Sequence, residues 1–179
     1  MATTLNSKDQ LDEMYSDAAA NRRELLCTGA SVVHGIDATN AQRCPLLRKT
    51  MAGRAPDVVV FNFPHAGWPI DYDSLLRGTV RGLFESNPFI ITRHQKLVDA
   101  FFTSCARTKG LLHDESRVQA MHKNAHPYDA WDIPGSAART GFKMASTYNV
   151  NHVHIYIFKL LPNRGLIVGV SSLTDTNRL

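Results

Sequence analysis

Apolar positions in the first part of the chain recur with the spacing of an amphipathic helix. Ser7 and Gln10 have the spacing of a capping box, in which the two side chains satisfy each other's backbone N–H groups. Apolar residues then follow at intervals of three and four, and Gly29 supplies a helix-ending signal. We therefore predict one helix over residues 7–28. Its apolar stripe consists of Leu11, Met14, Tyr15, Ala18, Leu25 and Leu26.

The same kind of pattern predicts further helices and several strands. Helical spacing extends over residues 91–109, and a shorter helix is predicted over 133–140. Residues 57–61 form a continuous β-branched, apolar run, which is typical of a strand covered on both faces. Other strands are predicted at 30–36, 116–121, 142–148, 152–158 and 166–170, with a turn at 162–165 that joins the last two into a terminal hairpin.

This order of elements predicts an α/β fold with a mostly parallel sheet. We expect a single domain over residues 1–170 and a tail over 171–179. Ligands of such sheets bind at the carboxyl ends of the strands. Asp37 and residues 62–67 and 122–131 all follow predicted strands, so they are expected to converge on one edge. Residues 68–87, rich in Gly, Pro, Asp and Arg, are predicted to form a long loop.

Composition narrows the class of protein. The chain has 179 residues, of which 44% are hydrophobic and 20% charged, as in ordinary globular domains. No apolar run approaches membrane-spanning length, and no signal peptide is evident at the N-terminus. Three cysteines without metal-type spacing favour a reduced, intracellular protein. A net charge of +4 permits a polyanionic partner such as RNA but does not require one.

The loop that follows the strand at 57–61 is the strongest candidate site. Asn62 offers a donor and an acceptor to a nucleobase edge, and Phe63 could stack on a base. Pro64 is expected to hold the preceding residue in an extended conformation. His65 could move a proton near neutral pH. The alternative is a plain turn in which the Asn caps backbone groups and the Phe belongs to the core.

Other polar residues are weaker candidates. Asp37 could bind a ribose or an adenine amine, or it could simply cap a helix. In the segment 122–131, Lys123 could meet a phosphate while Tyr128 or Trp131 flanks a base; the alternative is a surface loop pinned by the tryptophan. The histidines lack a recognisable set of metal ligands, so no metal is expected. Neither a Gly-x-Gly-x-x-Gly loop nor a Ser-His-Asp motif is present.

Several ordered blocks of this sequence resemble the eukaryotic 25S rRNA (uridine-N3)-methyltransferase-like family. They are Ala2-Thr3-Thr4-Leu5-Asn6-Ser7, Gly35-Ile36-Asp37-Ala38-Thr39, Phe61-Asn62-Phe63-Pro64-His65-Ala66-Gly67 and Pro127-Tyr128-Asp129-Ala130-Trp131-Asp132-Ile133. The resemblance implies a Rossmann-like class I methyltransferase sheet with helices on both faces. It also implies S-adenosylmethionine as cofactor, methylation of N3 of a uridine in large-subunit rRNA, rRNA or a pre-ribosome as partner, and a nucleolar location; without it, the cytoplasm is the default expectation.

The resemblance also assigns roles to residues. It implies that Asn62, Phe63, Pro64 and His65 form the catalytic loop beside the methyl group and the target base. Since N3 of uridine must lose a proton before it is methylated, and His65 is the only titrating group in this loop, we expect His65 to act as the base. Asp37 would lie near the adenine, and Asn6 would stand where family members usually bind the ribose hydroxyls with Asp. The resemblance thus implies two cofactor-binding residues, Asn6 and Asp37. Methyl transfer from S-adenosylmethionine needs no metal, so none is expected.

One departure from the family has a structural consequence. Members begin with a strand and a Gly-Asp-Gly-type loop that cradles the cofactor, and residues 1–179 contain no such segment. In the family order this first strand lies between the second and the fourth, so we expect a gap in the sheet and a truncated copy that binds S-adenosylmethionine poorly. The competing functions are a non-catalytic RNA-binding or ribosome-assembly protein, a small-molecule methyltransferase and, more remotely, a metal-dependent hydrolase.

Overall fold

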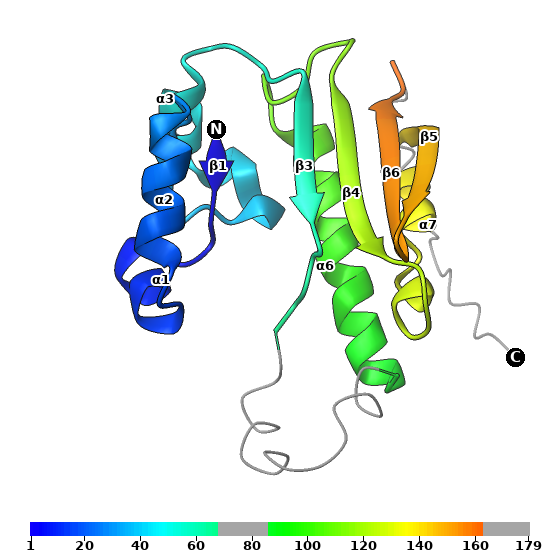
Figure 1. Ribbon diagram of the computed structural model, residues 1–179. Helices are drawn as coiled ribbons and strands as arrows, with labels where there is room; N and C mark the ends of the chain where they lie inside the picture. Colours follow the sequence, from blue (N-terminus) through cyan, green and yellow to red (C-terminus); the bar gives the residue numbers. More distant parts are fainter. Residues whose placement is uncertain (68–85, 163–179) are drawn as a thin grey trace, which may run out of the picture.

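The chain forms a mixed α/β structure, seen in a computed structural model that describes residues 1–67 and 86–162 (Figure 1). Most of the predicted loop at 68–87, the predicted strand at 166–170 and the tail lie outside the described residues. The elements are β1 (Ala2–Thr3), α1 (Lys8–Met14), α2 (Ala18–Cys27), β2 (Val32–Val33), η1 (Ala38–Arg43), α3 (Pro45–Met51), β3 (Val58–Asn62), α6 (Pro88–Arg107), β4 (Arg117–Lys123), η2 (Tyr128–Trp131), α7 (Ile133–Arg139), β5 (Phe142–Val150) and β6 (Val153–Leu160).

The larger sheet is mixed, not mostly parallel as predicted. Its strand order is β3-β4-β6-β5; β3 pairs with β4 in parallel, and the other two pairings are antiparallel. β5 and β6 form a C-terminal hairpin whose loop, Asn151 and His152, has φ angles of 47° and 64°. Two consecutive positive φ values are those of a type I′ turn, which matches the twist of the strands. A terminal hairpin is thus present, one strand earlier than predicted.

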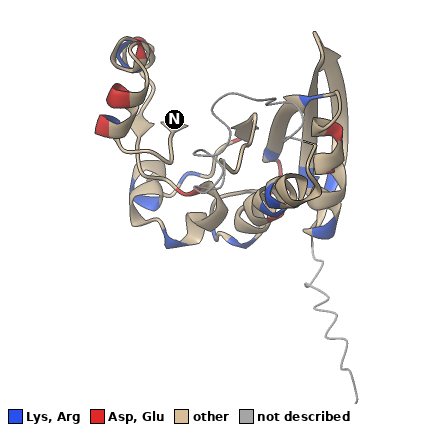
Figure 2. Cartoon of the chain, turned by 90° about the horizontal axis from the view of Figure 1, so that it is seen from below, with Lys and Arg blue, Asp and Glu red and all other residues tan. Residues whose placement is uncertain are grey.

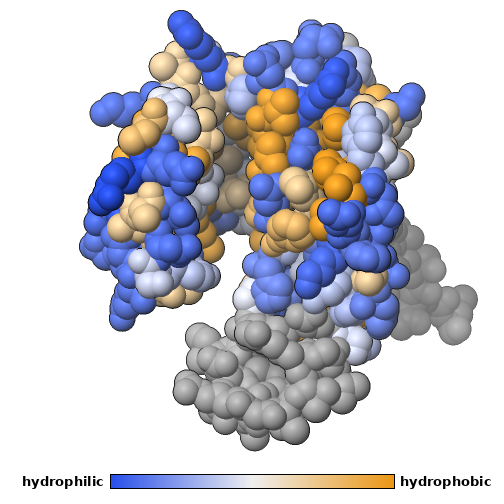
Figure 3. All heavy atoms as spheres, viewed as in Figure 1, coloured by the Kyte–Doolittle hydropathy of each residue, from blue (hydrophilic) through white to orange (hydrophobic). Residues whose placement is uncertain are grey.

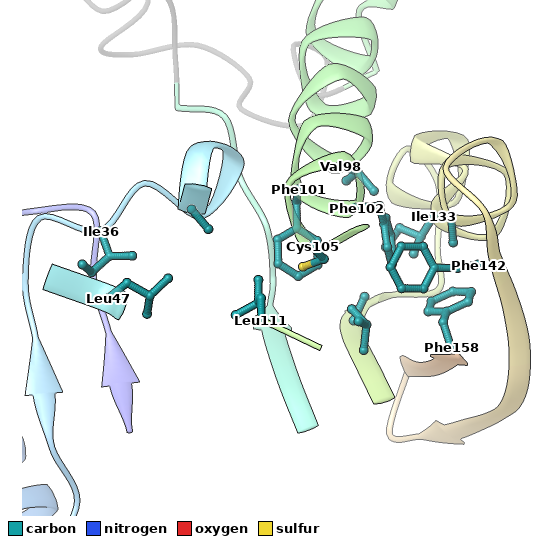
Figure 4. Packing of buried hydrophobic residues seen from close by; sticks show 14 of the residues in the cluster. Ile36, Leu47, Val98, Phe101, Phe102, Cys105, Leu111, Ile133, Phe142 and Phe158 are labelled. Carbon is teal, nitrogen blue, oxygen red and sulfur yellow. The ribbon is translucent and has the colours of Figure 1, made fainter. Parts of the chain in front are cut away.

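A second, two-stranded sheet stands beside the first. β1 and β2 pair in parallel, with Ala2 opposite Val32 and Thr3 opposite Val33. In Figure 4, β1 lies between β2 and β3, and in Figure 1, β1 and β3 run in the same direction without meeting. Within the described residues each of these two strands therefore has a single neighbour.

The N-terminal helix predicted over 7–28 is in fact two helices. The capping box is confirmed, with Ser7 Oγ accepting from Gln10 N at 3.2 Å and Gln10 Oε1 accepting from Ser7 N at 2.9 Å. Tyr15 then takes up an extended conformation and breaks the helix. Arg22 of α2 donates two hydrogen bonds, at 2.8 and 2.9 Å, to the carboxylate of Asp12 in α1, and this contact lowers the pKa of Asp12 to about 2. The helical spacing of apolar residues continues through both helices. It therefore does not show that the chain breaks at Tyr15 and that α2 folds back on α1 through the Asp12–Arg22 pair.

The main core lies between α6 and one face of the larger sheet (Figure 4). Phe102, fully buried, has ring-centroid distances of 5.2 to 5.3 Å to Phe101, Phe142 and Phe158. Edge-to-face and tilted aromatic pairs of this kind contribute beyond their buried area. Asn87 is the N-cap of α6. The apolar face predicted for this helix is the face that is buried in the core. The helix thus anchors the strands that lead to the candidate site.

The opposite face of the sheet is open in the described residues, contrary to the prediction for residues 57–61. Val59 and Phe61 are half-buried on the α6 side, but Val58 and Val60 point away and are 46% and 48% exposed. Figure 3 shows apolar side chains gathered on this face. A continuous apolar run predicts two buried faces because most such strands have helices on both sides; here the described helices cover only one.

One buried hydrogen bond links the N-terminal region to the core. Ser104 Oγ, in α6, accepts from the backbone N–H of Ala41 in η1 at 2.9 Å. We expect Ser104→Ala to lower the free energy of unfolding by about 1–3 kcal/mol, because it leaves a buried N–H without a partner. Urea unfolding followed by circular dichroism measures the change. The matched control is Thr92→Ala on the exposed side of the same helix, and equal effects of the two substitutions would contradict the assignment.

Candidate functional site

The carboxyl ends of β3 and β4 bring two loops together. These strands are parallel neighbours, so they end at the same edge of the sheet, and Phe63 N donates to Met121 O at 2.8 Å just beyond β3. The predicted meeting of segments 62–67 and 122–131 is thereby confirmed. Together they enclose a cavity of about 250 Å³ lined by Phe63, Pro64, His65, His122, Lys123, Tyr128 and Trp131.

The backbone bends sharply as it leaves β3. Phe63 has a φ of 46°, in the left-handed region, so the expectation of an extended conformation before Pro64 is wrong. Its side chain is 47% exposed, whereas Pro64 is buried. A bulky residue in this region carries backbone strain, and such strain clusters at binding sites and catalytic sites. The aromatic ring is therefore held toward solvent at the cavity and is not part of the core.

Two consecutive residues of α6 hold the loop in place. His94 Nδ1 accepts from Ala66 N at 3.1 Å, and Arg93 Nη2 donates to Ala66 O at 3.2 Å. Both backbone groups of one loop residue are thus satisfied from the same helix turn. Sequence reasoning missed this role because the helical pattern shows that a residue lies on a helix, but not which loop the helix meets.

His65 is oriented by its own loop. Its Nδ1 accepts from Gly67 N at 3.0 Å, and its ring lies 4.4 Å from the His94 ring, centroid to centroid. A neutral imidazole that accepts at Nδ1 carries its proton at Nε2. In this arrangement the ring is a hydrogen-bond donor at Nε2, and the base role expected from sequence requires the Gly67 contact to open.

Below the cavity, imidazole and indole rings form a buried cluster. Trp131 is 1% exposed; its ring stacks on His94 with a centroid distance of 3.8 Å and an interplanar angle of 17°, and lies 4.1 Å from the ring of His122. His94 Nε2 and Trp131 Nε1 are buried and have no hydrogen-bond partner among residues 1–67 and 86–162. Trp131 thus packs in the core, as its alternative interpretation held, and also lines the cavity.

The two buried histidines are neutral at physiological pH. Burial, with smaller contributions from the nearby His65, His122 and Arg93, lowers the pKa of His94 to about 4. Burial likewise lowers the pKa of His122 to about 4, with a contribution from Lys123, while the backbone of Tyr128 opposes the shift. His94 and His122 therefore pack against Trp131 as neutral rings, and these buried rings place no charge beneath the cavity.

A cation stands at the rim of the cavity. Lys123 Nζ lies 4.6 Å from the centroid of the Tyr128 ring and 3.4 Å from its hydroxyl. This is a cation–π contact at an exposed position. The ammonium group is placed where a phosphate or carbonyl oxygen of a ligand could reach it, as the sequence had left open.

The two residues expected near a cofactor lie outside the lining of this cavity. Asp37 Oδ1 accepts from Thr39 N at 2.9 Å, so it caps η1, which was the alternative interpretation. Asn6, beyond β1, donates from Nδ2 to Met14 Sδ at 3.7 Å. Asn6 Oδ1 and Asp37 Oδ2 make no hydrogen bond within the described part of the chain.

The described residues contain no group of three or more metal-ligating side chains. They also contain no helix that is long and apolar enough to cross a membrane.

Fold and site together define an α/β domain with a cavity lined by aromatic rings at the carboxyl ends of two parallel strands. Comparison with known families makes the assignment specific. Residues 1–156 match the family described as BMT5-like, rRNA (uridine-N3-)-methyltransferase BTM5-like, and the chain belongs to that family.

Two curated plant proteins are similar to this chain. The heavy metal-associated isoprenylated plant protein 41 of Arabidopsis thaliana is 35% identical over 138 residues, which is 77% of this chain but 23% of that protein. The uncharacterized protein At4g26485 of the same species is 28% identical over 160 residues, covering 88% of this chain and 68% of that protein. The chain thus spans about a quarter of the first relative and two thirds of the second.

Proposed function

We propose that this chain is a Rossmann-like class I methyltransferase domain that acts with S-adenosylmethionine on N3 of a uridine in large-subunit rRNA. Family membership over residues 1–156 carries the proposal. Two features support it: the spatial order β2-β1-gap-β3-β4-β6-β5, and the loop from Asn62 to His65 at the rim of an aromatic cavity. The location that goes with this function is the nucleolus.

The residues of the cavity suit a flipped-out pyrimidine. Phe63 offers an exposed ring face for stacking, worth on the order of 1–3 kcal/mol per base. Lys123 and Tyr128 supply polar groups at the rim, and the exposed His65 ring lines the same cavity. Asn62 is exposed beside this loop, where its amide could pair with a base edge. Positioning and proton transfer by these side chains are the protein's contribution to catalysis.

The proposed cofactor residues offer acceptors of the right kind. Asn6 Oδ1 and Asp37 Oδ2 could each accept a hydrogen bond from a ribose hydroxyl or an adenine amine. S-adenosylmethionine, when bound, supplies an activated methyl group. Within the described residues β1 and β3 belong to separate sheets, so no strand joins the proposed cofactor residues to the loop that follows β3. That observation favours the second candidate, an RNA-binding or ribosome-assembly protein without catalysis.

Cofactor titration and methyl transfer separate the two candidates. Isothermal titration with S-adenosylmethionine is combined with transfer of labelled methyl groups to transcribed large-subunit rRNA, mapped by reverse-transcription stops. Binding and a stop at one uridine are expected for the methyltransferase. RNA binding with neither cofactor binding nor methylation would establish the non-catalytic alternative, and transfer to small metabolites alone would indicate a small-molecule enzyme.

Substitution of His65 tests the role of the loop. We expect His65→Ala to lower the methyl-transfer rate about 100-fold or more, which is the usual effect of losing a group that moves or holds a proton. His65→Gln keeps a hydrogen-bond donor: substantial activity of this variant supports a donor role, and its loss supports the base role. His113→Ala, in the turn that precedes β4, is the matched control. Unchanged methylation by His65→Ala would remove this residue from catalysis.

A further inference from the structure

The cavity at the ends of β3 and β4 has an unpaired cation at its rim. Among the described residues that line it, Lys123 alone is a lysine or arginine. Lys123 is exposed, lies against the ring and hydroxyl of Tyr128, and makes no ion pair within the described part of the chain. The carboxylate closest to it in sequence, Asp129, lies 3.7 Å from Nδ1 of His126. The ammonium group of Lys123 therefore has no carboxylate to neutralise it.

The strands around the cavity add positive charge and no negative charge. Figure 2 shows blue segments on the larger sheet. Within their described bounds, β3, β4, β5 and β6 contain no Asp or Glu. A surface of one sign attracts ligands of the opposite sign. The basic residues of these strands are Arg117, Lys123, Lys143 and Lys159.

The lining offers little to a proton that must be removed from a ligand. Its other titratable residues, among those described, are His65, His122 and Tyr128. His65 Nδ1 already accepts from Gly67 N. Burial lowers the pKa of His122 to about 4, which makes its ring a weak base, and a tyrosine is ordinarily protonated at neutral pH. The cavity is thus better suited to hold a ring that has lost its proton than to take the proton away.

A uracil ring is an acid of this kind. When its N3–H bond breaks, the proton passes to solvent water, and the electron pair stays on the ring, spread over N3, O2 and O4. A positive charge within about 4–6 Å favours the ionised form of an acid. Any ring inside a cavity of about 250 Å³ lies close to the residues that line it, so the charge of Lys123 acts on such a ring.

We propose that the cavity selects the N3-deprotonated form of a uracil ring, with Lys123 as its counter-ion. The identity of the base rests on the proposed function, which this inference deepens: Lys123 makes N3 nucleophilic by stabilising the anion, and no protein base is required. Lys123 recognises an anionic oxygen, and a phosphate group also carries one. The aromatic walls favour the ring, because a phosphate among them would lose its hydration without matching donors.

Nucleosides, which contain no phosphate, test the proposal at a fixed pH of about 8. Binding to the whole chain is measured by saturation-transfer nuclear magnetic resonance. Fluorine withdraws electrons and makes 5-fluorouridine a stronger acid at N3 than uridine, so more of it is ionised. If only the ionised form binds, apparent affinity is proportional to the ionised fraction, and we expect 5-fluorouridine to bind about tenfold or more tightly than uridine. 5-Fluorocytidine and cytidine have no N3 proton to lose, and they are expected to bind alike.

Variants of Lys123 identify the counter-ion. Lys123→Met removes the charge and keeps a long side chain, and it is expected to bind 5-fluorouridine about tenfold more weakly, whereas Lys123→Arg retains the preference. Lys143→Met, at an exposed lysine of β5 outside the lining, is the matched control and is expected to bind as the unsubstituted chain does. Circular dichroism checks that each variant folds.

Several results would overturn the proposal. They are equal binding of 5-fluorouridine and uridine, an equal gain from fluorine in cytidine, an unchanged preference in Lys123→Met, and no detectable binding of any nucleoside at millimolar concentration. Tighter binding of uridine 5′-monophosphate that depends on Lys123, without a preference for 5-fluorouridine, would make this residue a phosphate contact instead. Selective binding of the anion by a chain that transfers no methyl group would support this inference and refute the proposed activity.

Discussion

Replacing Trp131 with alanine is expected to lower the free energy of unfolding by about 3–5 kcal/mol, which is the range for deleting a large buried aromatic side chain. Trp131 is 1% exposed and contacts the rings of His94 and His122. Its loss leaves a cavity beneath the loop and removes the stacking surface of two imidazoles. Since a whole domain is stable by only about 5–15 kcal/mol, this variant is expected to be partly unfolded at 37 °C.

Phe63→Ala is the matched control for this prediction. Phe63 lines the same cavity but is 47% exposed and has a φ of 46°. Its truncation is expected to change the free energy of unfolding by less than about 0.5 kcal/mol. Urea unfolding of both variants, followed by far-ultraviolet circular dichroism, measures the difference. If the two substitutions cost the same, the assignment of one ring to the core and the other to ligand contact is wrong.

Acidification from pH 6.5 to pH 4 is expected to destabilise the protein through His94 and His122. The pKa of each is lowered from 6.5 to about 4 in the folded state, chiefly by burial. The unfolded chain therefore binds protons first as the pH falls, and it gains stability relative to the folded chain. The contribution is fully present above pH 6.5 and is lost progressively down to pH 4. Each histidine accounts for about 2–3 kcal/mol over this window.

Variants of single histidines identify the source of this pH dependence. His122→Phe keeps a ring against Trp131 but cannot be protonated, so it is expected to lose less stability between pH 6.5 and 4 than the unsubstituted chain does. Thr92→Ala, an exposed and non-titrating position of α6, is the control and is expected to leave the pH dependence unchanged. The carboxyl of Asp12, with a pKa of about 2, acts at lower pH and does not enter this window. Equal slopes for all three proteins would exclude the buried histidines as the cause.

The neutrality of these rings also bears on the proposed catalysis. His65 lies beside His94, and protonation of the buried rings in acid would place positive charge directly under the loop. Because the folded protein protonates these rings only near pH 4, any loss of methyl transfer caused by their charge is expected near that pH. A decline in activity at a pH where unfolding is not yet detectable would locate the effect in the loop itself.

The chemistry of the loop could be predicted from the sequence, but its conformation could not. The strand before Asn62, the end of that strand and the polar residues that follow are local signals of composition and periodicity. Phe63 has a left-handed φ, and Ala66 donates a hydrogen bond to His94 and accepts one from Arg93, residues 28 and 27 positions away. Periodicity contains no information about such partners, which explains why the supporting histidine was missed.

The sequence by itself determined the local elements: the capping box at Ser7, the amphipathic helix now seen as α6, the strand β3 and the family to which its loop belongs. Each of these rests on side chains within a few residues of one another. Only the tertiary structure decided the fold-back of α1 on α2, the antiparallel pairing of β6 with β4 and the two buried histidines around Trp131. These depend on which distant segments share a face or an edge.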